Sequence, residues 1–406
     1  MPAAPAIHPE LISGGRRAEL EPTKSKLFGH LPFLDGLRAL SIFAVLTFHS
    51  GGAIGAFCFK NGGWAGVDVF FVISGFLITA ILLKERDKAG TVSLKNFYAR
   101  RALRLMPVFY LWIIVTAIRK IAEHKFVPGA AAISAVYMTD YDLALGWGAV
   151  LGSGFEVAWS LSVEEKFYLL WPSVVKFFRK SLLPVGVVAI LACFAWRSYL
   201  ICHGAPWIRI CGAFDTKIDA IMIGCVAAIL MNNVQVEFWF KKYLRSGLVS
   251  LALLVAIVYF MRGMGHPNGA HTIQQQLIYW NVRVPCFTLA VAALIVSLCS
   301  SPQGIGSRIL SFAPLVWVGR VSYSLYLWHI AGFAFAVWFG FQCGLVTSTD
   351  KELLQYAWSL VFAAISYYFV ETPFLRLKDR FSFKGDSEKR RQGVAERREL
   401  VGAVRD

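Results

Sequence analysis

The chain is long, apolar and basic: of its 406 residues 57% are hydrophobic and only 16% are charged, and its formal net charge is +16. Soluble domains carry about 25% charged residues, so this composition excludes an ordinary soluble protein. A nucleic-acid-binding protein would gather such a positive excess on one face. Here the lysines and arginines lie between long apolar runs, which indicates a membrane protein with many spans and no nucleic-acid partner.

The apolar runs predict about ten transmembrane helices, because each run is close to the roughly 20 residues that a helix needs to cross a bilayer. The runs lie at about 33–50, 64–83, 106–122, 160–178, 182–201, 216–231, 246–262, 282–299, 322–341 and 353–370. The predicted fold class is therefore all-α, a polytopic membrane helical bundle. A further apolar stretch at about 128–150 is ambiguous, and the glycines between 146 and 154 favour an outer loop with a short or re-entrant piece.

The basic clusters predict the orientation of the helices, since loops rich in lysine and arginine stay in the cytoplasm. We place the N-terminal segment 1–30 in the cytoplasm. Ten spans then also put the later basic clusters and a basic tail 378–406 on the cytoplasmic side. An eleventh span at 128–150 would move the later clusters outside. Segment 1–30 lacks the order of a signal peptide, so we expect an uncleaved first span and one membrane domain over residues 31–377.

The first predicted span contains two ionisable side chains, Arg38 and His49. A charge at such depth costs roughly 2.5–3.5 kcal/mol, so it marks a functional site by default. The two residues lie eleven positions apart, which places them on one helix face and roughly 16 Å apart along the axis. Imidazole accepts a proton near neutral pH, so His49 is a candidate general base. The alternative is a packed histidine that hydrogen-bonds between helices.

Acidic residues on later spans are candidates to orient the histidine, as an acid does in a catalytic dyad. Asp68 begins the second run, and Glu164 lies in the segment WSLSVEEKFYLLWP. For Asp68 an ion pair with Lys217 that only holds helices together is an equally open alternative. Asp215 and Asp219 flank Lys217 at the start of another span, where they either hold helix ends together or bind a sugar hydroxyl.

Two arginines of the third run form a candidate phosphate site. Arg101 and Arg104 lie three residues apart in FYARRALRLMP, so they share a helix face. Guanidinium groups bind phosphates through two hydrogen bonds, although basic residues also occur at cytoplasmic helix ends for reasons of topology alone. The eight cysteines show no CxxC pair or Cys/His spacing, so we expect neither a metal site nor a disulfide framework.

The order of these segments resembles the acyltransferase family 3 membrane proteins over about residues 33–377. The matching segments are LDGLRALSIFAVLTFH, GVDVFFVISGFLIT, FYARRALRLMPVFY, WSLSVEEKFYLLWP, DTKIDAIMIGC, YSLYLWH and ETPF. The resemblance implies an O-acyltransferase in the bacterial inner membrane. Such an enzyme transfers an acyl group, usually acetyl, from cytoplasmic acyl-CoA to a hydroxyl of a carbohydrate acceptor: a surface polysaccharide, a lipid-linked glycan or an oligosaccharide.

The resemblance also implies roles for individual residues. Arg38 and His49 match the Arg-x10-His motif that is taken as catalytic, and Arg101 and Arg104 match an Arg-x2-Arg motif associated with the acyl donor. Glu164 matches the acid of the WSLSxE segment. We therefore expect catalytic roles for His49, Arg38, Asp68 and Glu164, acyl-CoA contacts from Arg38, Arg101 and Arg104, and acceptor contacts from Asp215, Asp219 and His329.

A proton-coupled transporter or flippase of a glycan or lipid is the alternative function, since an arginine and a histidine inside a bundle also suit a proton path. Transporters of this kind often show internal repeats with interrupted helices in matching positions, and the chain has no clear repeat. Consumption of acyl-CoA separates the two functions.

Overall fold

In the part of the chain that the computed structural model describes, every regular element is a helix. That part is residues 31–377 and Phe381, except positions 52, 53, 55, 56, 58, 60, 61, 179, 180, 267, 268, 270, 345 and 346. Within these described residues, eight helical segments are long and apolar enough to cross a membrane by length and composition. The predicted fold class, a polytopic bundle of membrane helices, is confirmed.

Each of the ten predicted spans falls on one long helix. These helices are α1 (Pro32–Ser50), α3 (Gly66–Ala89), α4 (Leu94–Ala122), α7 (Ala158–Phe177), α8 (Leu182–Cys202), α10 (Phe214–Met231), α12 (Gly247–Met264), α14 (Val284–Ser300), α16 (Ala313–Gln342) and α17 (Ser348–Ser366). Helices α7 and α10 are not among the eight apolar segments, because both carry several charged residues in their first halves.

Shorter elements connect the long helices. They are η1 (Gly63–Ala65), α5 (Pro128–Ala135), α6 (Thr139–Leu145), α9 (Trp207–Gly212), α11 (Val234–Leu244), α13 (Ile273–Ile278), α15 (Ile305–Leu310), α18 (Thr372–Leu377) and the π-helical turns η3 (Tyr279–Arg283) and η4 (Tyr367–Glu371). The ambiguous stretch 128–150 thus folds as two helices too short to span a bilayer. Segment 1–30 and, apart from Phe381, the tail 378–406 lie outside the described residues.

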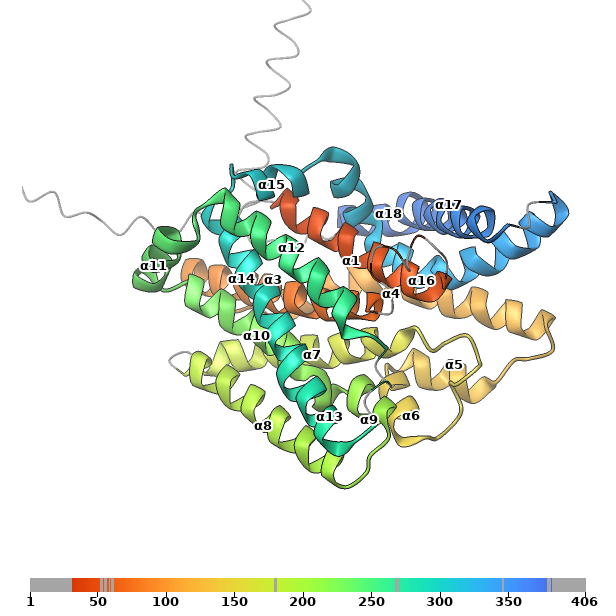
Figure 1. Cartoon of the computed structure of the whole chain (residues 1–406), viewed down its shortest axis with the longest axis horizontal. Coiled ribbons are helices and arrows are strands. Elements are labelled where there is room, and N and C mark those ends of the chain that lie inside the picture. The colour runs from red at the N-terminus through yellow and green to blue at the C-terminus, as the bar shows by residue number, and fades with distance from the viewer. Residues whose placement is uncertain are drawn as a thin grey trace, which may run out of the picture.

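Helix α3 lies at the centre of the bundle, in contact with α1, α7, α10 and α14 (Figure 1). It crosses α10 at a pair of glycines. A Cβ atom on Gly75 would lie 2.0 Å from the carbonyl oxygen of Ile221, and one on Gly224 would lie 2.1 Å from that of Val72. Membrane helices associate closely where small residues let their backbones approach, and this crossing is such a place.

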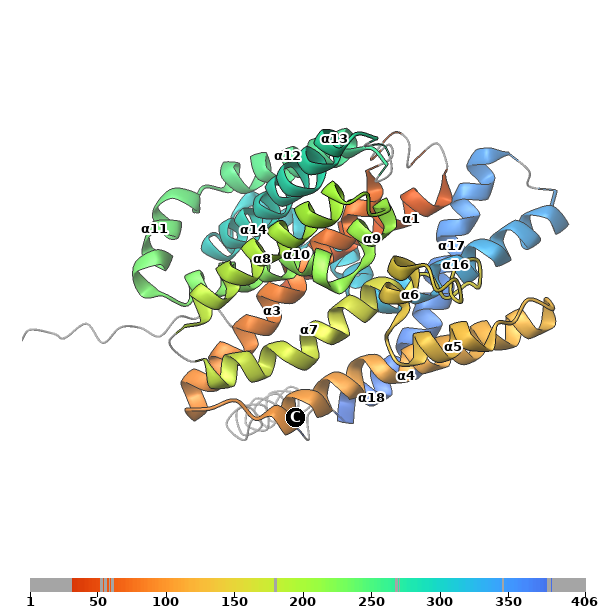
Figure 2. The ribbon, with the colours of Figure 1, turned by 90° about the horizontal axis from the view of Figure 1, so that it is seen from below.

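Helices α1 and α16 pack side by side and run in the same direction. Near their beginnings, a Cβ atom on Gly319 would lie 1.8 Å from the carbonyl oxygen of Asp35. Further along, the rings of His49 and His329 lie 5.1 Å apart. We call the end of the bundle where α1 begins the arginine end and the end where it finishes the histidine end. Figure 2 shows α11 and the loops with α5 and α6 on opposite sides of the view.

Candidate active site

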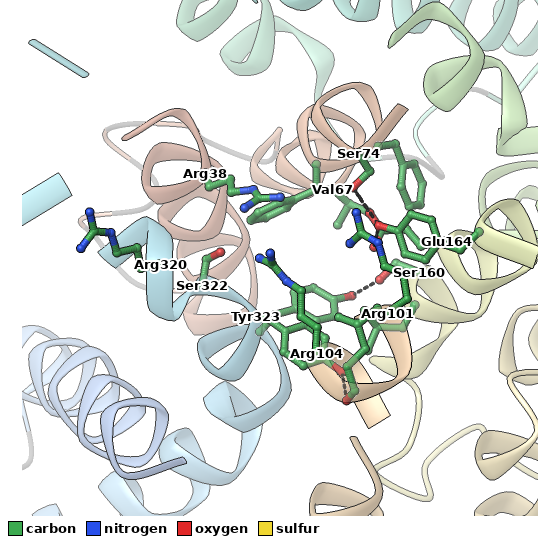
Figure 3. Close-up of a pocket in the computed structure, with 16 residues that line it drawn as sticks. Arg38, Val67, Ser74, Arg101, Arg104, Ser160, Glu164, Arg320, Ser322 and Tyr323 are labelled. Atoms are coloured by element: carbon green, nitrogen blue, oxygen red, sulfur yellow. Dashed lines mark hydrogen bonds between the residues drawn. The ribbon is translucent and has the colours of Figure 1, made fainter. Parts of the chain in front are cut away.

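A cavity opens among α1, α3, α4, α7 and α16 toward the arginine end. Its empty volume is about 660 Å³, including space that is open to solvent. Figure 3 shows Arg38, Arg101 and Arg104 directed toward this space, with Arg320 of α16 at its edge. We call it the arginine cavity. The structure therefore brings the three predicted arginines together.

The arginine cavity is positively charged and poor in acidic partners. Arg101 and Arg104 form no hydrogen bond or ion pair with a described residue, and the Arg101 guanidinium lies 4.8 Å from the centre of the Tyr168 ring. The nearest carboxylate to Arg38 and Arg320 is Asp35, at 3.8 and 3.9 Å. Guanidinium groups with so few carboxylate partners are available to bind an anion.

Arg320 was not among the predicted site residues. Its position in the wall of the arginine cavity with Tyr323 and Tyr326 only becomes clear in the fold. The signal that could have found it is a charged residue inside the apolar helix that begins at Ala313.

Glu164 lies in the wall of the arginine cavity. Its carboxylate accepts hydrogen bonds from Ser74 of α3, at 2.7 Å, and from the Tyr168 hydroxyl, at 3.2 Å. No contact within the described part of the chain joins Glu164 to His49. The predicted role of Glu164 in orienting His49 stays a prediction. Its observed partners, Ser74 and Tyr168, line the arginine cavity.

Two histidines meet at the far end of α1. The His329 ring is fully buried, and its Nδ1 lies 2.6 Å from the Tyr326 carbonyl oxygen. A carbonyl oxygen can only accept, so Nδ1 carries the proton and Nε2 presents its lone pair. This Nε2 is buried without a hydrogen-bond partner among the described residues. His49, 5.1 Å away between ring centres, is exposed at the end of its helix.

Tyr326 connects the arginine cavity with the histidine pair. Its side chain lines the cavity, and its ring centre lies 5.8 Å from that of His329. Its hydroxyl accepts a hydrogen bond from Ser160, at 2.6 Å, and donates one to the Val157 carbonyl, at 3.0 Å. A series of contacting groups thus leads from the arginines through Tyr326 to His329 and His49.

Asp68 belongs to a separate buried network. It pairs with Lys217 at 2.5 Å, and both side chains are almost fully buried. Asp219 pairs with the buried Arg197 at 2.9 Å. The ion pair considered for Asp68 is therefore present, and these pairs join α3, α10 and α8. Within the described chain, no contact links Asp68 to His49.

Asp215 contacts basic and aromatic residues at the start of α10. Its carboxylate accepts hydrogen bonds from both terminal nitrogens of Arg209, at 2.9 and 2.5 Å, and from the Trp196 indole, at 2.7 Å. Asp215 and Asp219 are thus each engaged by an arginine, and the structure does not bring either beside His329. Among the described residues, no group of three or more His, Cys, Asp or Glu could hold a metal ion.

Comparison with known proteins places the chain in a family. A family model described as an acyltransferase domain matches residues 31–372. The peptidoglycan O-acetyltransferase OatA of Listeria monocytogenes is 29% identical over 379 residues, which cover 89% of this chain and 58% of that protein. The "Putative peptidoglycan O-acetyltransferase YrhL" of Bacillus subtilis is 29% identical over 381 residues, with 86% and 56% covered. No solved structure matches.

The chain therefore spans a little over half the length of these two relatives. The family model, by contrast, extends over nearly all of the described helices, and it includes the arginine cavity and both histidines. On this match the chain belongs to acyltransferase family 3, as the order of its motifs predicted.

Proposed function

We propose that this membrane acyltransferase takes an acetyl group from acetyl-CoA at the arginine end and transfers it to a carbohydrate hydroxyl at the histidine end. The observation that carries the proposal is the series of contacts from the arginine cavity through Tyr326 to His329 and His49. Membership of the family supports acyl transfer, and the names of the relatives support acetyl as the group transferred.

The donor fits the arginine cavity by charge. Acetyl-CoA carries several phosphate groups at one end and a neutral arm with the thioester at the other. Arg38, Arg101 and Arg104, with Arg320 at the edge, offer guanidinium groups that match phosphate in geometry and charge. The neutral arm then extends past Tyr326 toward the histidine pair.

We assign the general base to His49 and the positioning of that base to His329. The Nε2 of His329 is buried without a hydrogen-bond partner among the described residues, and the His49 ring centre lies 5.1 Å from that of His329. On this assignment the Nε2 lone pair accepts the N–H of His49 during the reaction, which holds the other nitrogen of His49 unprotonated toward the acceptor. His49 takes the proton of the acceptor hydroxyl as its oxygen attacks the thioester carbonyl. The C–S bond breaks, an ester forms, and the proton passes from His49 to the CoA thiolate.

This assignment gives Asp68 and Glu164 other tasks. Asp68 holds α3 to α10 through Lys217, and Glu164 helps to shape the donor cavity with Ser74. A covalent acetyl-histidine that carries the group outward is a variant of the same chemistry, with His49 as the nucleophile.

The acceptor is a glycan of the cell envelope on this proposal, because OatA is named for the O-acetylation of peptidoglycan. The arginine end faces the cytoplasm, where the basic clusters predict it and where acyl-CoA is available. Both termini then lie in the cytoplasm, and the protein lies in the plasma membrane.

The test is single-turnover transfer from radiolabelled acetyl-CoA by purified protein in nanodiscs. We expect CoA thiol release and labelled glycan from the wild type, and a rate lower by about 100-fold or more in His49→Ala, with acetyl-CoA still bound. The double variant Arg101→Gln/Arg104→Gln should instead weaken acetyl-CoA binding.

The matched control is Arg119→Gln, because Arg119 pairs with Glu123, the residue that follows α4, and does not line the arginine cavity. It should behave as the wild type. A folded wild-type protein that neither binds nor consumes acetyl-CoA would overturn the proposal in favour of a proton-coupled transporter.

A further inference from the structure

A second cavity lies at the histidine end, between the end of α12 and the π-helical turn η3. Its empty volume is about 730 Å³, including space open to solvent. The polar side chains in its wall are those of His266, Gln275, Tyr279 and Arg283. No aspartate or glutamate is among the described residues that line it. We call it the outer cavity.

Ring contacts connect the outer cavity with the proposed general base. The His266 ring lies 5.6 Å from the ring of Phe48, which precedes His49, and 5.9 Å from that of Trp207. The neighbouring Gly265 carbonyl accepts the indole N–H of Trp64, at 3.0 Å, which fixes this loop against η1. The Phe48 ring, whose centre lies 5.4 Å from that of His49, thus connects the outer cavity with the proposed general base.

The wall of the outer cavity offers hydrogen-bond donors that the protein itself leaves unused. Arg283 is exposed and forms no ion pair with a described residue. Tyr279 is 6% exposed, and its buried hydroxyl has no hydrogen-bond partner in the described part of the chain, since the single N–H of Trp64 goes to Gly265. A ligand that forms a hydrogen bond with this hydroxyl would offset the free-energy cost of burying it without a partner.

Two local structures hold these donors in place. The Gln275 side-chain oxygen accepts the backbone N–H groups of His271 and Thr272 in a capping box, so its amide N–H groups are what it can offer a ligand. Tyr279 and Arg283 are the first and last residues of the π-helical turn η3, and both line the outer cavity. Such turns occur frequently at functional sites.

We propose that the outer cavity is the acceptor subsite, and that Arg283 selects a glycan that carries an anionic group close to the acetylated sugar. The anionic group is either a sugar carboxylate or the phosphate of a lipid-linked glycan. Both present oxygens that a guanidinium binds in the same way. The inference rests on the proposed function, because it names the acceptor of that same reaction.

The experiment compares three acceptors in nanodiscs with saturating acetyl-CoA. They are a neutral N-acetylglucosamine oligomer, a glycan of equal length in which N-acetylmuramic acid alternates with N-acetylglucosamine, and a disaccharide on polyprenyl diphosphate. We expect the wild type to prefer an anionic acceptor through a lower KM. The carboxylate arm and the diphosphate arm then distinguish the two sources of charge.

Variants of the wall test the residues. Arg283→Gln should raise the KM for the preferred anionic acceptor about 10-fold or more, as expected for a lost hydrogen bond to a charged group, and Arg283→Lys should recover part of this. Tyr279→Phe should raise the same KM without lowering the melting temperature, because the hydroxyl that it removes has no partner in the free protein. Arg119→Gln should keep the wild-type preference.

Different results would overturn the acceptor subsite and the proposed acetyl transfer. If CoA is released but neutral and anionic acceptors have equal KM values, and Arg283→Gln changes neither, the inference is overturned and the proposed function stands. If Tyr279→Phe lowers the melting temperature and leaves KM unchanged, the outer cavity is structural. If the wild type releases no CoA with any acceptor, the proposed function itself has failed.

Discussion

His329 gives the sharpest prediction for a single residue. Its Nε2 has no partner among the described residues although the ring is fully buried, so we assign it to hold His49. His329→Phe removes the lone pair and should lower single-turnover acetyl transfer about 100-fold or more. His329→Gln, whose side-chain oxygen can also accept a hydrogen bond, should keep part of the rate. The measurement is transfer rate against pH, with acetyl-CoA affinity measured in parallel.

A purely structural His329 would give a different pattern. Both variants would then lower the melting temperature in the nanodisc, and the transfer rate of the folded fraction would stay near that of the wild type. Equal rates for His329→Gln and His329→Phe would also contradict the positioning role, because only glutamine retains an acceptor.

Much of the site could be predicted from single residues. A charge or histidine inside an apolar run is costly, so Arg38, His49, Arg101 and Arg104 stand out in the sequence. Tyr326 could not be found in this way, since a tyrosine in an apolar run costs little, and its role depends on α16 packing against α1 and α7. The sequence likewise could not choose which buried group lies against His49.

At the scale of helices, the Asp68–Lys217 pair joins α3 to α10. Lys217→Met leaves a buried carboxylate without its cation, which should cost about 3–5 kcal/mol in the free energy of unfolding. The double variant Asp68→Asn/Lys217→Met removes both charges and should recover most of that loss. The measurements are thermal unfolding and CoA release of the wild type, Lys217→Met and the double variant.

The double variant also decides between the two roles considered for Asp68. If Asp68 only joins helices, the double variant should regain activity together with stability. A stable double variant without CoA release would show that the carboxylate takes part in the chemistry, and the assignment of the orienting role to His329 would then be wrong.

The close approach of α1 and α16 at Gly319 gives a second prediction at this scale. In Gly319→Ala the added methyl group meets the Asp35 carbonyl oxygen, so the two helices must separate. We expect a loss of about 1–3 kcal/mol in stability, as for other overpacked sites, and slower transfer because the histidines move apart. Gly212→Ala is the control, since nothing lies within 4 Å of its added Cβ. Equal melting temperatures for both variants would contradict this view of the contact.

The spans themselves were predictable because each is an apolar run of the right length, and the basic clusters excluded an eleventh. The sequence did not reveal which helices touch. Glu164, for example, lies only six residues from the start of α7, yet its partners are Ser74 of α3 and a tyrosine of its own helix. Such pairings depend on crossings like that at Gly75, which no local pattern records.

For the whole molecule, the two cavities lie at opposite ends of α1, so donor and acceptor should approach from opposite sides of the membrane. In proteoliposomes the exposed Cys343, which follows α16 at the histidine end, reports orientation when it reacts with a membrane-impermeant maleimide. Vesicles with protected Cys343 should consume externally added acetyl-CoA, and vesicles with reactive Cys343 should not. Label should then appear on glycan enclosed in the vesicles that consume acetyl-CoA.

Cys343→Ser is the labelling control. Consumption of acetyl-CoA and labelling of glycan on the same side as Cys343 would require that both substrates enter at the histidine end, and the arginine cavity would then need another ligand.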